Sequence, residues 1–255
     1  MRDPATILIT GASSGIGEAL ARHYARPGRF LALSGRHAER LEAVADACRT
    51  TGAAVETRVI DVGDEEAMRA WIETVDDRHP LDLVIANAGI AVSPDRLTPL
   101  ADATRRTFAA NVSGVFHTVH PALERMKRRR RGQIAIMSSI AGYRGLPAAA
   151  PYSASKVAVK AYGEALRGAY RGRVEVSVIC PGFVESRMTA KNRFPMPFLM
   201  TGEKAARIIA RGLARNRGVI AFPWPLVLLM RLLVCLPQPL SDWVLRHSPK
   251  KDEHV

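Results

Sequence analysis

The amino-acid sequence predicts an α/β protein: a single doubly wound domain in which a seven-stranded parallel sheet carries helices on both faces. Short β-branched or apolar runs alternate along the 255 residues with longer segments of helical period. Neighbouring parallel strands need a crossover connection, commonly a helix, so this repeated alternation indicates a sheet covered on both sides. No Pro/Gly/Ser-rich linker interrupts the alternation, which argues for one domain rather than two.

The expected elements can be placed by residue range. Strands are expected at residues 7–10, 30–34, 55–59, 83–86, 133–138, 175–180 and 219–222. Helices are expected at residues 15–26, 38–51, 65–78, 101–129, 152–170 and 202–215. Because ligands of doubly wound sheets bind beyond the carboxyl ends of the strands, the residues that follow each strand are the candidates for a functional site.

Composition bears on the class of partner. The chain has 37 Lys and Arg residues against 24 Asp and Glu residues, a net charge of +13. This excess favours anionic partners such as nucleotide phosphates, acidic carrier proteins or anionic lipid headgroups. The arginines are spread along the chain, so we do not expect a dedicated nucleic-acid surface. The one basic run, residues 127–131, is predicted to be a solvated corner at the amino end of the strands.

Neither a metal site nor a disulfide framework is expected. The three cysteines, Cys48, Cys180 and Cys235, are far apart and form no CxxC pair, which fits a reducing compartment. Too little chain precedes the strand at residue 7 for a secretory signal. We therefore expect a cytoplasmic protein.

A glycine-rich turn follows the first expected strand and opens directly into a helix. It reads Thr10-Gly11-Ala12-Ser13-Ser14-Gly15-Ile16-Gly17. Glycines allow a tight turn and a close approach of the backbone to a pyrophosphate, which then lies on the unpaired N–H groups of the helix N-terminus. The same turn could be only a sharp strand-to-helix corner, so the dinucleotide interpretation needs support from another strand end.

The second strand end supplies that support and indicates the dinucleotide. Folds of this kind often place an acid about 20 residues beyond the glycines to bond the ribose 2′-hydroxyl, whereas an arginine there suits a 2′-phosphate. Arg36 stands 19 residues beyond Gly17, with no acid expected in reach. Because a guanidinium matches a phosphate, NADP(H) is favoured over NAD(H).

Two further strand ends carry candidate cofactor contacts. Asp61 and Val62 follow the third strand, where Asp61 could bond the adenine amino group or cap the following turn. The fourth strand is followed by a bend of small residues against which a ribose could pack. That bend is Asn87-Ala88-Gly89.

The fifth strand end and the next helix supply groups for acid–base chemistry. Tyr152 and Lys156 are four residues apart, so their side chains share one helix face. An ammonium beside a phenol favours phenolate and would lower the pKa of Tyr152 toward neutral pH, as a general acid/base for an alcohol or ketone requires. Ser139, just beyond the strand, could donate a hydrogen bond to a carbonyl oxygen on which charge develops.

Over residues 5 to 222, these motifs and their order resemble the short-chain dehydrogenase/reductase family, whose domain is Rossmann-like. The matching residues are the glycine turn, Asn87-Ala88-Gly89, Asn111, Ser138-Ser139, Tyr152, Lys156 and Pro181-Gly182. The resemblance implies that Ser139 polarises the substrate oxygen and that Tyr152 exchanges the proton. It also implies that Lys156 bonds the nicotinamide ribose and acidifies the tyrosine, and that Asn111 holds a water of the proton relay. Ser138 is then expected to be a structural neighbour.

The resemblance extends to the segment after the sixth strand. Pro181, Gly182 and Val184 are expected to contact the cofactor, and Ser186 stands where the family has a threonine near the nicotinamide carboxamide. Residues 183–201 would close over the substrate, and their Met and Phe side chains would line a pocket for an apolar, lipid-, steroid- or terpenoid-like molecule. Alternatively, these side chains pack on the sheet edge.

Residues 223–255 form an apolar C-terminal extension of the catalytic, dinucleotide-binding part at residues 1–222. Residues 224–236 are apolar around a whole helix, yet too few to cross a membrane. The extension could be a lid, a subunit contact, or a segment that touches the inner face of a membrane through residues 224–245. The resemblance implies a homo-oligomer.

The leading hypothesis is an NADP(H)-dependent oxidoreductase that transfers a hydride between nicotinamide and a carbonyl or secondary alcohol of an apolar substrate. Within enzymes, the alternative is a 3-oxoacyl thioester reductase, whose acidic carrier would suit the positive charge. From another class, the alternative is a non-catalytic NADP-binding sensor or scaffold.

Overall fold

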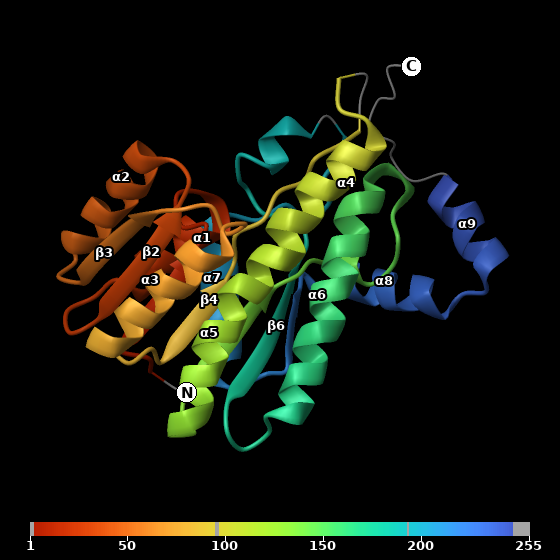
Figure 1. Ribbon diagram of the computed structural model, residues 1–255. Helices are drawn as coiled ribbons and strands as arrows, with labels where there is room; N and C mark the ends of the chain where they lie inside the picture. Colours follow the sequence, from red (N-terminus) through yellow and green to blue (C-terminus); the bar gives the residue numbers. More distant parts are fainter. Residues whose placement is uncertain (1–2, 95–96, 193, 247–255) are drawn as a thin grey trace.

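One parallel sheet organises the molecule (Figure 1). The computed structural model describes residues 3–94, 97–192 and 194–246. Its seven strands run in the order β3-β2-β1-β4-β5-β6-β7, which confirms the predicted doubly wound α/β fold. The strands are β1 Thr6–Thr10, β2 Phe30–Gly35, β3 Ala54–Val59, β4 Leu83–Ala86, β5 Gln133–Met137, β6 Glu175–Pro181 and β7 Val219–Phe222. Each predicted strand is present, and its ends differ by at most one residue.

Helices cover both faces of the sheet and enclose two apolar clusters. They are α1 Gly15–Tyr24, α2 Ala38–Arg49, α3 Glu65–Arg78, α4 Leu100–Phe108, α5 Gly114–Arg129, α6 Ala150–Ala169, α7 Gly202–Ala214, α8 Trp224–Cys235 and α9 Gln238–Arg246. One cluster packs α1, α2 and α7 on the sheet, around Leu20, Leu41 and Ile209. The other packs α3, α5 and α6 on the opposite face, around Trp71 and Val119. A strand that is buried on both faces is apolar at successive positions, which is why continuous apolar runs predicted these strands.

The single helix expected over residues 101–129 is interrupted. A wider π-helical turn, Ala109–Ser113, joins α4 to α5, and Asn111 lies in it fully buried. At this widened turn the Asn111 side chain forms hydrogen bonds with groups outside its own helix. Periodicity alone did not show this interruption, because one extra residue in a turn barely disturbs the apolar pattern.

Within the basic run at residues 127–131, Arg128, Arg130 and Arg131 are exposed, as expected of a solvated corner, but Arg129 is drawn into an ion pair with a buried carboxylate. The Arg129 guanidinium donates to both carboxylate oxygens of Asp76, at 2.8 and 2.9 Å, and to the Leu81 carbonyl at 2.6 Å. Asp76 is only 5% exposed. Arg131 pairs with Asp82 at 3.1 Å. Arg129 therefore anchors the end of α5 to α3 and to the loop that leads into β4, at the end of the sheet opposite the candidate site.

The C-terminal extension is formed by α8 and α9; α8 lies next to α6, and α9 follows it at the edge of the molecule (Figure 1). Leu226, Val227, Met230 and Leu233 of α8 face inward and are buried. Other apolar side chains of the extension are exposed: Trp224, Leu228, Leu229, Leu232, Val234, Leu240, Trp243 and Val244. No helix of the described residues has the length and apolarity needed to cross a membrane. The end of the predicted extension, residues 247–255, lies outside the described residues.

Candidate active site

The glycine turn between β1 and α1 is held by the end of β4. Thr10 Oγ1 accepts hydrogen bonds from the backbone N–H groups of Asn87 and Ala88, both at 3.1 Å. In return, Asn87 Nδ2 donates to the Thr10 carbonyl at 2.9 Å and to the Gly11 carbonyl at 3.2 Å. The Asn87 side chain thus fixes the shape of the glycine turn, a role for which the sequence supplied no specific signal.

Two positions of the turn require glycine. Gly15 adopts φ +59°, and a Cβ at Gly17 would lie 2.3 Å from the Gly11 carbonyl oxygen. Ser14 precedes α1 in extended conformation, and its side chain does not cap the helix. The first N–H groups of α1 are therefore open to an anion. Ile16 packs on the core below, and Ser13 Oγ would lie 3.0 Å from a Cβ at Gly35. The glycines and the uncapped N–H groups of this turn suit the pyrophosphate of a nicotinamide dinucleotide.

The ends of β2 and β3 meet through an ion pair. Arg36 Nη1 lies 3.5 Å from Asp61 Oδ2, and both side chains are just over half exposed. The expectation that no acid lies in reach of Arg36 is therefore wrong, because the sheet brings β3 beside β2. Asp61 Oδ1 also accepts from the Gly63 N–H at 2.9 Å, so the residue does cap its turn. The Val62 side chain packs against Gly114, and its carbonyl accepts from His117 Nδ1.

Ser139 and Tyr152 meet beyond the end of β5. Ser139 begins a short turn, Ile140–Gly142: its Oγ accepts from the Ala141 N–H at 3.1 Å and lies 3.4 Å from the Pro181 carbonyl. Burial raises the pKa of Tyr152, and its hydrogen bond with Ser139 acts in the opposite direction. The phenol and the serine hydroxyl thus converge where a substrate oxygen could accept from both.

Lys156 lies one helical turn further along α6, with its ammonium buried. Lys156 Nζ donates to the Met137 carbonyl at 2.9 Å and lies 5.7 Å from the centre of the Tyr152 ring. Burial lowers the pKa of Lys156 to about 8. Lys156 is not among the groups that shift the pKa of Tyr152, so the lowering of this pKa by the ammonium stays a prediction. As expected, Ser138 is structural: its Oγ donates to the Lys156 carbonyl at 2.8 Å.

Asn111 ties the π-helical turn to the loop after β4 and to α6. Its Oδ1 accepts from the Ile90 N–H at 2.8 Å, and its Nδ2 donates to the Ile90 carbonyl at 2.9 Å and to Ser155 Oγ at 3.0 Å. Ser155 Oγ in turn donates to the Tyr152 carbonyl. A Cβ at Gly89 would lie 3.0 Å from Asn111 Oδ1 and 3.3 Å from Lys156 Nζ. The water-holding role of Asn111 stays a prediction. Sequence reasoning missed Ser155, although a serine three residues after Tyr152 was a usable signal.

The segment after β6 returns to the glycine turn. The Gly182 N–H donates to the Phe222 carbonyl at 2.7 Å, and Val184 pairs with Met200 across the loop. Ser186 Oγ lies 3.1 Å from Thr189 Oγ1. A Cβ at Gly15 would lie 3.0 Å from Ser186 Cβ, so the segment lies over the turn. The contact of Ser186 with the carboxamide stays a prediction.

The loop at residues 183–201 keeps apolar side chains in solvent. Met188, Phe198 and Leu199 are 38%, 56% and 42% exposed, whereas Met200 is buried. Phe183 and Phe194 contact edge to face, with ring centres 6.0 Å apart. Packing on the sheet edge therefore does not account for Met188, Phe198 or Leu199.

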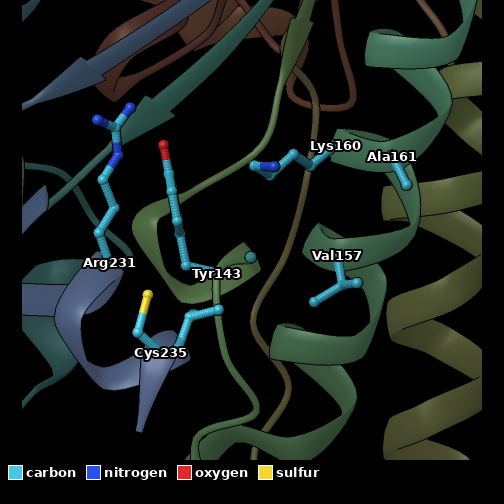
Figure 2. A pocket seen from close by; sticks show the side chains of 8 residues that line it. Tyr143, Val157, Lys160, Ala161, Arg231 and Cys235 are labelled. Atoms are coloured by element: carbon cyan, nitrogen blue, oxygen red, sulfur yellow. The ribbon is translucent and has the colours of Figure 1, made fainter.

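A hollow of about 460 Å³ separates α6 from α8 (Figure 2). Its lining is Gly142, Tyr143, Val157, Lys160, Ala161, Arg231, Val234 and Cys235. In Figure 2 the Tyr143 hydroxyl points toward the Arg231 guanidinium, and the two groups share a hydrogen bond. Ser139, Tyr152 and Lys156 do not line this hollow. The described residues also contain no cluster of metal ligands.

Comparison with known proteins agrees with this geometry. The family model of short chain dehydrogenases matches residues 5–196. The chain belongs to the short-chain dehydrogenase family. An uncharacterized oxidoreductase of Myxococcus xanthus is 39% identical over 239 residues, covering 93% of this chain and 94% of the relative. An 11-beta-hydroxysteroid dehydrogenase-like protein of Arabidopsis thaliana is 34% identical and covers 85% of this chain and 73% of the relative.

Two solved structures share the fold at 24% identity. A short chain dehydrogenase/reductase from Burkholderia phymatum, in complex with NAD, superposes with a TM-score of 0.83 over 100% of this chain and 99% of that one. A short-chain dehydrogenase from Sphingobium yanoikuyae, in complex with NADPH, superposes with a TM-score of 0.78 over 91% and 96%. The protein is therefore an oxidoreductase of a family that uses nicotinamide cofactors, and these neighbours hold both cofactor types.

Proposed function

We propose that this oxidoreductase uses NADP(H) to interconvert a carbonyl group and a secondary alcohol on an apolar, lipid-, steroid- or terpenoid-like substrate. The observation that carries the proposal is the convergence of Ser139, Tyr152 and Lys156 beside the glycine turn that would hold the cofactor. The bound nicotinamide would supply the hydride. The protein must then supply a proton, orientation and charge stabilisation.

The residues divide this work as follows in the direction of reduction. The Ser139 hydroxyl donates a hydrogen bond to the substrate carbonyl oxygen and stabilises its developing negative charge. Tyr152 donates the proton, and the burial that raises its pKa keeps the phenol protonated at neutral pH, the form that reduction needs. Lys156, whose pKa is about 8, holds a proton close to this phenol and would orient the nicotinamide ribose. Asn111 and Ser155 hold the backbone of α6 at Tyr152.

Two features support NADP(H) and an apolar substrate. Arg36 lies at the end of β2, where a 2′-phosphate would lie, and its guanidinium is half exposed. The exposed Met188, Phe198 and Leu199 would line the substrate side of the loop. The Arabidopsis relative carries a hydroxysteroid dehydrogenase-like name, which fits a large apolar substrate.

Assembly and location belong to the same proposal. We expect a homo-oligomer in the cytoplasm. The exposed apolar side chains of α8 and α9 are consistent with a subunit contact, a lid or contact with a membrane surface. Light scattering tests self-association, and flotation with phosphatidylcholine and phosphatidylglycerol vesicles tests lipid contact.

A substrate screen tests the proposed reaction. NADPH oxidation is followed over ketones of increasing chain length, steroid ketones and 3-oxoacyl thioesters. We expect turnover to increase with apolar size, and Tyr152→Phe to lower kcat at least about 1,000-fold while the Kd for NADPH stays within twofold. Tyr162→Phe is the matched control, because the Tyr162 hydroxyl bonds His120 outside the catalytic trio.

The alternatives give different results in the same screen. Faster reduction of the thioesters than of the free ketones would identify a 3-oxoacyl reductase. NADPH binding without turnover on any carbonyl compound would indicate the non-catalytic sensor and would contradict the proposal.

A further inference from the structure

The hollow between α6 and α8 has the size of a ligand pocket. Its volume of about 460 Å³ lies within the range of about 300–1,000 Å³ that small-molecule pockets occupy. Its walls are mostly apolar, and two of the lining side chains, Val157 and Val234, are 41% and 43% exposed. The hydrophobic effect favours an apolar molecule that covers these side chains. Because Ser139, Tyr152 and Lys156 do not line the hollow, such a molecule would not be the one that reacts.

One guanidinium group stands in this apolar surface. Arg231 is the only charged residue of α8. In Figure 2 the Tyr143 hydroxyl points toward the Arg231 guanidinium, and both side chains line the hollow. Within the part of the chain that the structure describes, Arg231 has this phenol as a partner and no carboxylate in ion-pair distance. Its charge is therefore available to an anion, and its planar donor groups match a carboxylate.

Two neighbouring groups add to the anion-binding character of this end of the hollow. Lys160 Nζ lies 5.1 Å from the centre of the Tyr143 ring, although Glu164, at 2.8 Å, offsets part of its charge. Burial raises the pKa of Tyr143, so the phenol keeps its proton at neutral pH. Since a guanidinium group can only donate, Arg231 donates to the phenol oxygen, and the phenol proton remains available. Arg231 and Tyr143 thus offer two neighbouring donors to the two oxygens of a carboxylate.

The hollow also shares a wall with the turn that carries Ser139. Gly142, the last residue of this turn, lines the hollow, and Tyr143 follows it directly. A Cβ at Gly142 would lie 2.8 Å from the Lys156 carbonyl oxygen and 2.8 Å from Ser138 Oγ, so the wall packs tightly on α6. A molecule held by Tyr143 would therefore contact the segment that positions Ser139 while leaving the catalytic groups uncovered.

We infer that the hollow between α6 and α8 is a second binding site, for a single-tailed amphiphile with a carboxylate head, such as a fatty acid anion. The head accepts hydrogen bonds from Arg231 and from the Tyr143 hydroxyl, with the Lys160 ammonium nearby. The alkyl chain lies along Val157 and Val234. This site uses none of the residues on which the proposed function depends, so each can be tested without the other.

Alkylation of Cys235 tests the site without any measurement of turnover. The Cys235 thiol lines the hollow and is exposed, whereas Cys48 and Cys180 are buried. Mass spectrometry follows the reaction with iodoacetamide at increasing concentrations of dodecanoate, kept below micelle formation, and gives the Kd. We expect dodecanoate to slow the reaction. Dodecanol, which lacks the charge, and hexanoate, which has a shorter chain, should each bind at least about 10-fold more weakly.

Substitutions separate the head contacts from the chain contacts. Arg231→Gln and Ala161→Trp, which fills the hollow from α6, should each raise the Kd for dodecanoate about 10-fold or more. Arg231→Lys should fall between the wild type and Arg231→Gln, because lysine keeps the charge without the paired donors. Tyr143→Phe should raise the Kd about fivefold. Arg211→Gln is the matched control and should change nothing, since Arg211 is exposed on α7, on the other face of the sheet.

Other occupants of the hollow would give different results, each of which overturns the inference. Protection of Cys235 by phosphatidylglycerol vesicles but not by dodecanoate would indicate a membrane surface. Protection that rises with protein concentration, without added amphiphile, would indicate a second copy of this chain. Equal slowing by dodecanoate and dodecanol, or an unchanged Kd in Arg231→Gln, would show that the hollow does not select a carboxylate.

Discussion

Two groups of arginines lie at opposite ends of the sheet and differ in their partners. At the amino ends, Arg129 and Arg131 reach Asp76 and Asp82, two carboxylates that are 5% and 8% exposed. At the carboxyl ends, Arg36 pairs with the half-exposed Asp61, and within the described residues neither Arg40 nor Arg187 has a carboxylate in ion-pair distance. The first group joins elements of the fold, whereas the second leaves charge available to an anion. Whether an arginine has a buried carboxylate partner, more than how many arginines lie together, distinguishes a structural cation from one that can bind a ligand.

The largest stability effect is expected where the pairing is most complete. Asp76→Asn should lower the free energy of unfolding by about 3 kcal/mol, because it removes a charged partner from the Arg129 guanidinium in a buried pair. Asp77→Asn is the control, since Asp77 is 63% exposed, and should cost less than about 1 kcal/mol. Urea unfolding measures both. Equal losses would show that the Asp76 pair is no more than a surface contact.

At the carboxyl ends of the strands we expect a large effect on cofactor binding and a small effect on stability. Arg36→Ser should weaken NADPH binding about 10- to 100-fold, since a charge-assisted hydrogen bond contributes about 1.5–3 kcal/mol, while the free energy of unfolding changes by less than about 0.5 kcal/mol. Fluorescence titration gives the Kd values, with NADH as the control ligand. Undiminished preference for NADPH would show that Arg36 does not hold the 2′-phosphate.

Lys156 sharpens the comparison, since this buried cation donates a hydrogen bond to a backbone carbonyl and has no carboxylate in ion-pair distance among the described residues. Its pKa is lowered to about 8, whereas the unfolded chain keeps the ordinary value near 10.5. Between these pH values the unfolded state binds the extra proton, so the contribution of Lys156 to stability rises with pH, by about 1 kcal/mol from pH 8 to 9.

Lys156→Met removes this titration. Urea unfolding at pH 7, 8 and 9 should show that the free energy of unfolding of the wild type increases with pH relative to that of Lys156→Met. Parallel profiles would mean that the ammonium is not desolvated in the folded protein.

The smallest effect is expected at Arg131, which is 69% exposed although its partner Asp82 is not. Arg131→Gln should cost about 0.5 kcal/mol. The other Asp82 carboxylate oxygen accepts from the backbone N–H groups of Ala5 and Thr6, so Asp82→Ala should cost clearly more. Thermal unfolding of the two variants ranks them, and the reverse order would show that Asp82 serves mainly as the partner of Arg131.

Sequence patterns predicted the sheet well because the inner strands are short apolar runs between polar turns, with both faces buried, whereas the edge strand β3 is partly exposed and alternates apolar with polar residues. They also predicted that Ser139, Tyr152 and Lys156 belong together, since spacing on a helix decides which side chains share a face. The π-helical turn at Asn111 and the pairing of Arg129 with Asp76 were not predictable in this way. Both depend on partners 21 to 53 residues away in the chain.

By itself, the sequence determined the order of the elements, the glycine turn and the identity of the groups available for acid–base chemistry, because these depend on local periodicity and side-chain type. The tertiary structure decided which charges meet. It brought Asp61 beside Arg36, buried Lys156 and Tyr152 enough to shift their pKa values, and placed Ser186 over Gly15. Electrostatic interactions depend on distance and burial, and only the folded chain sets these two quantities.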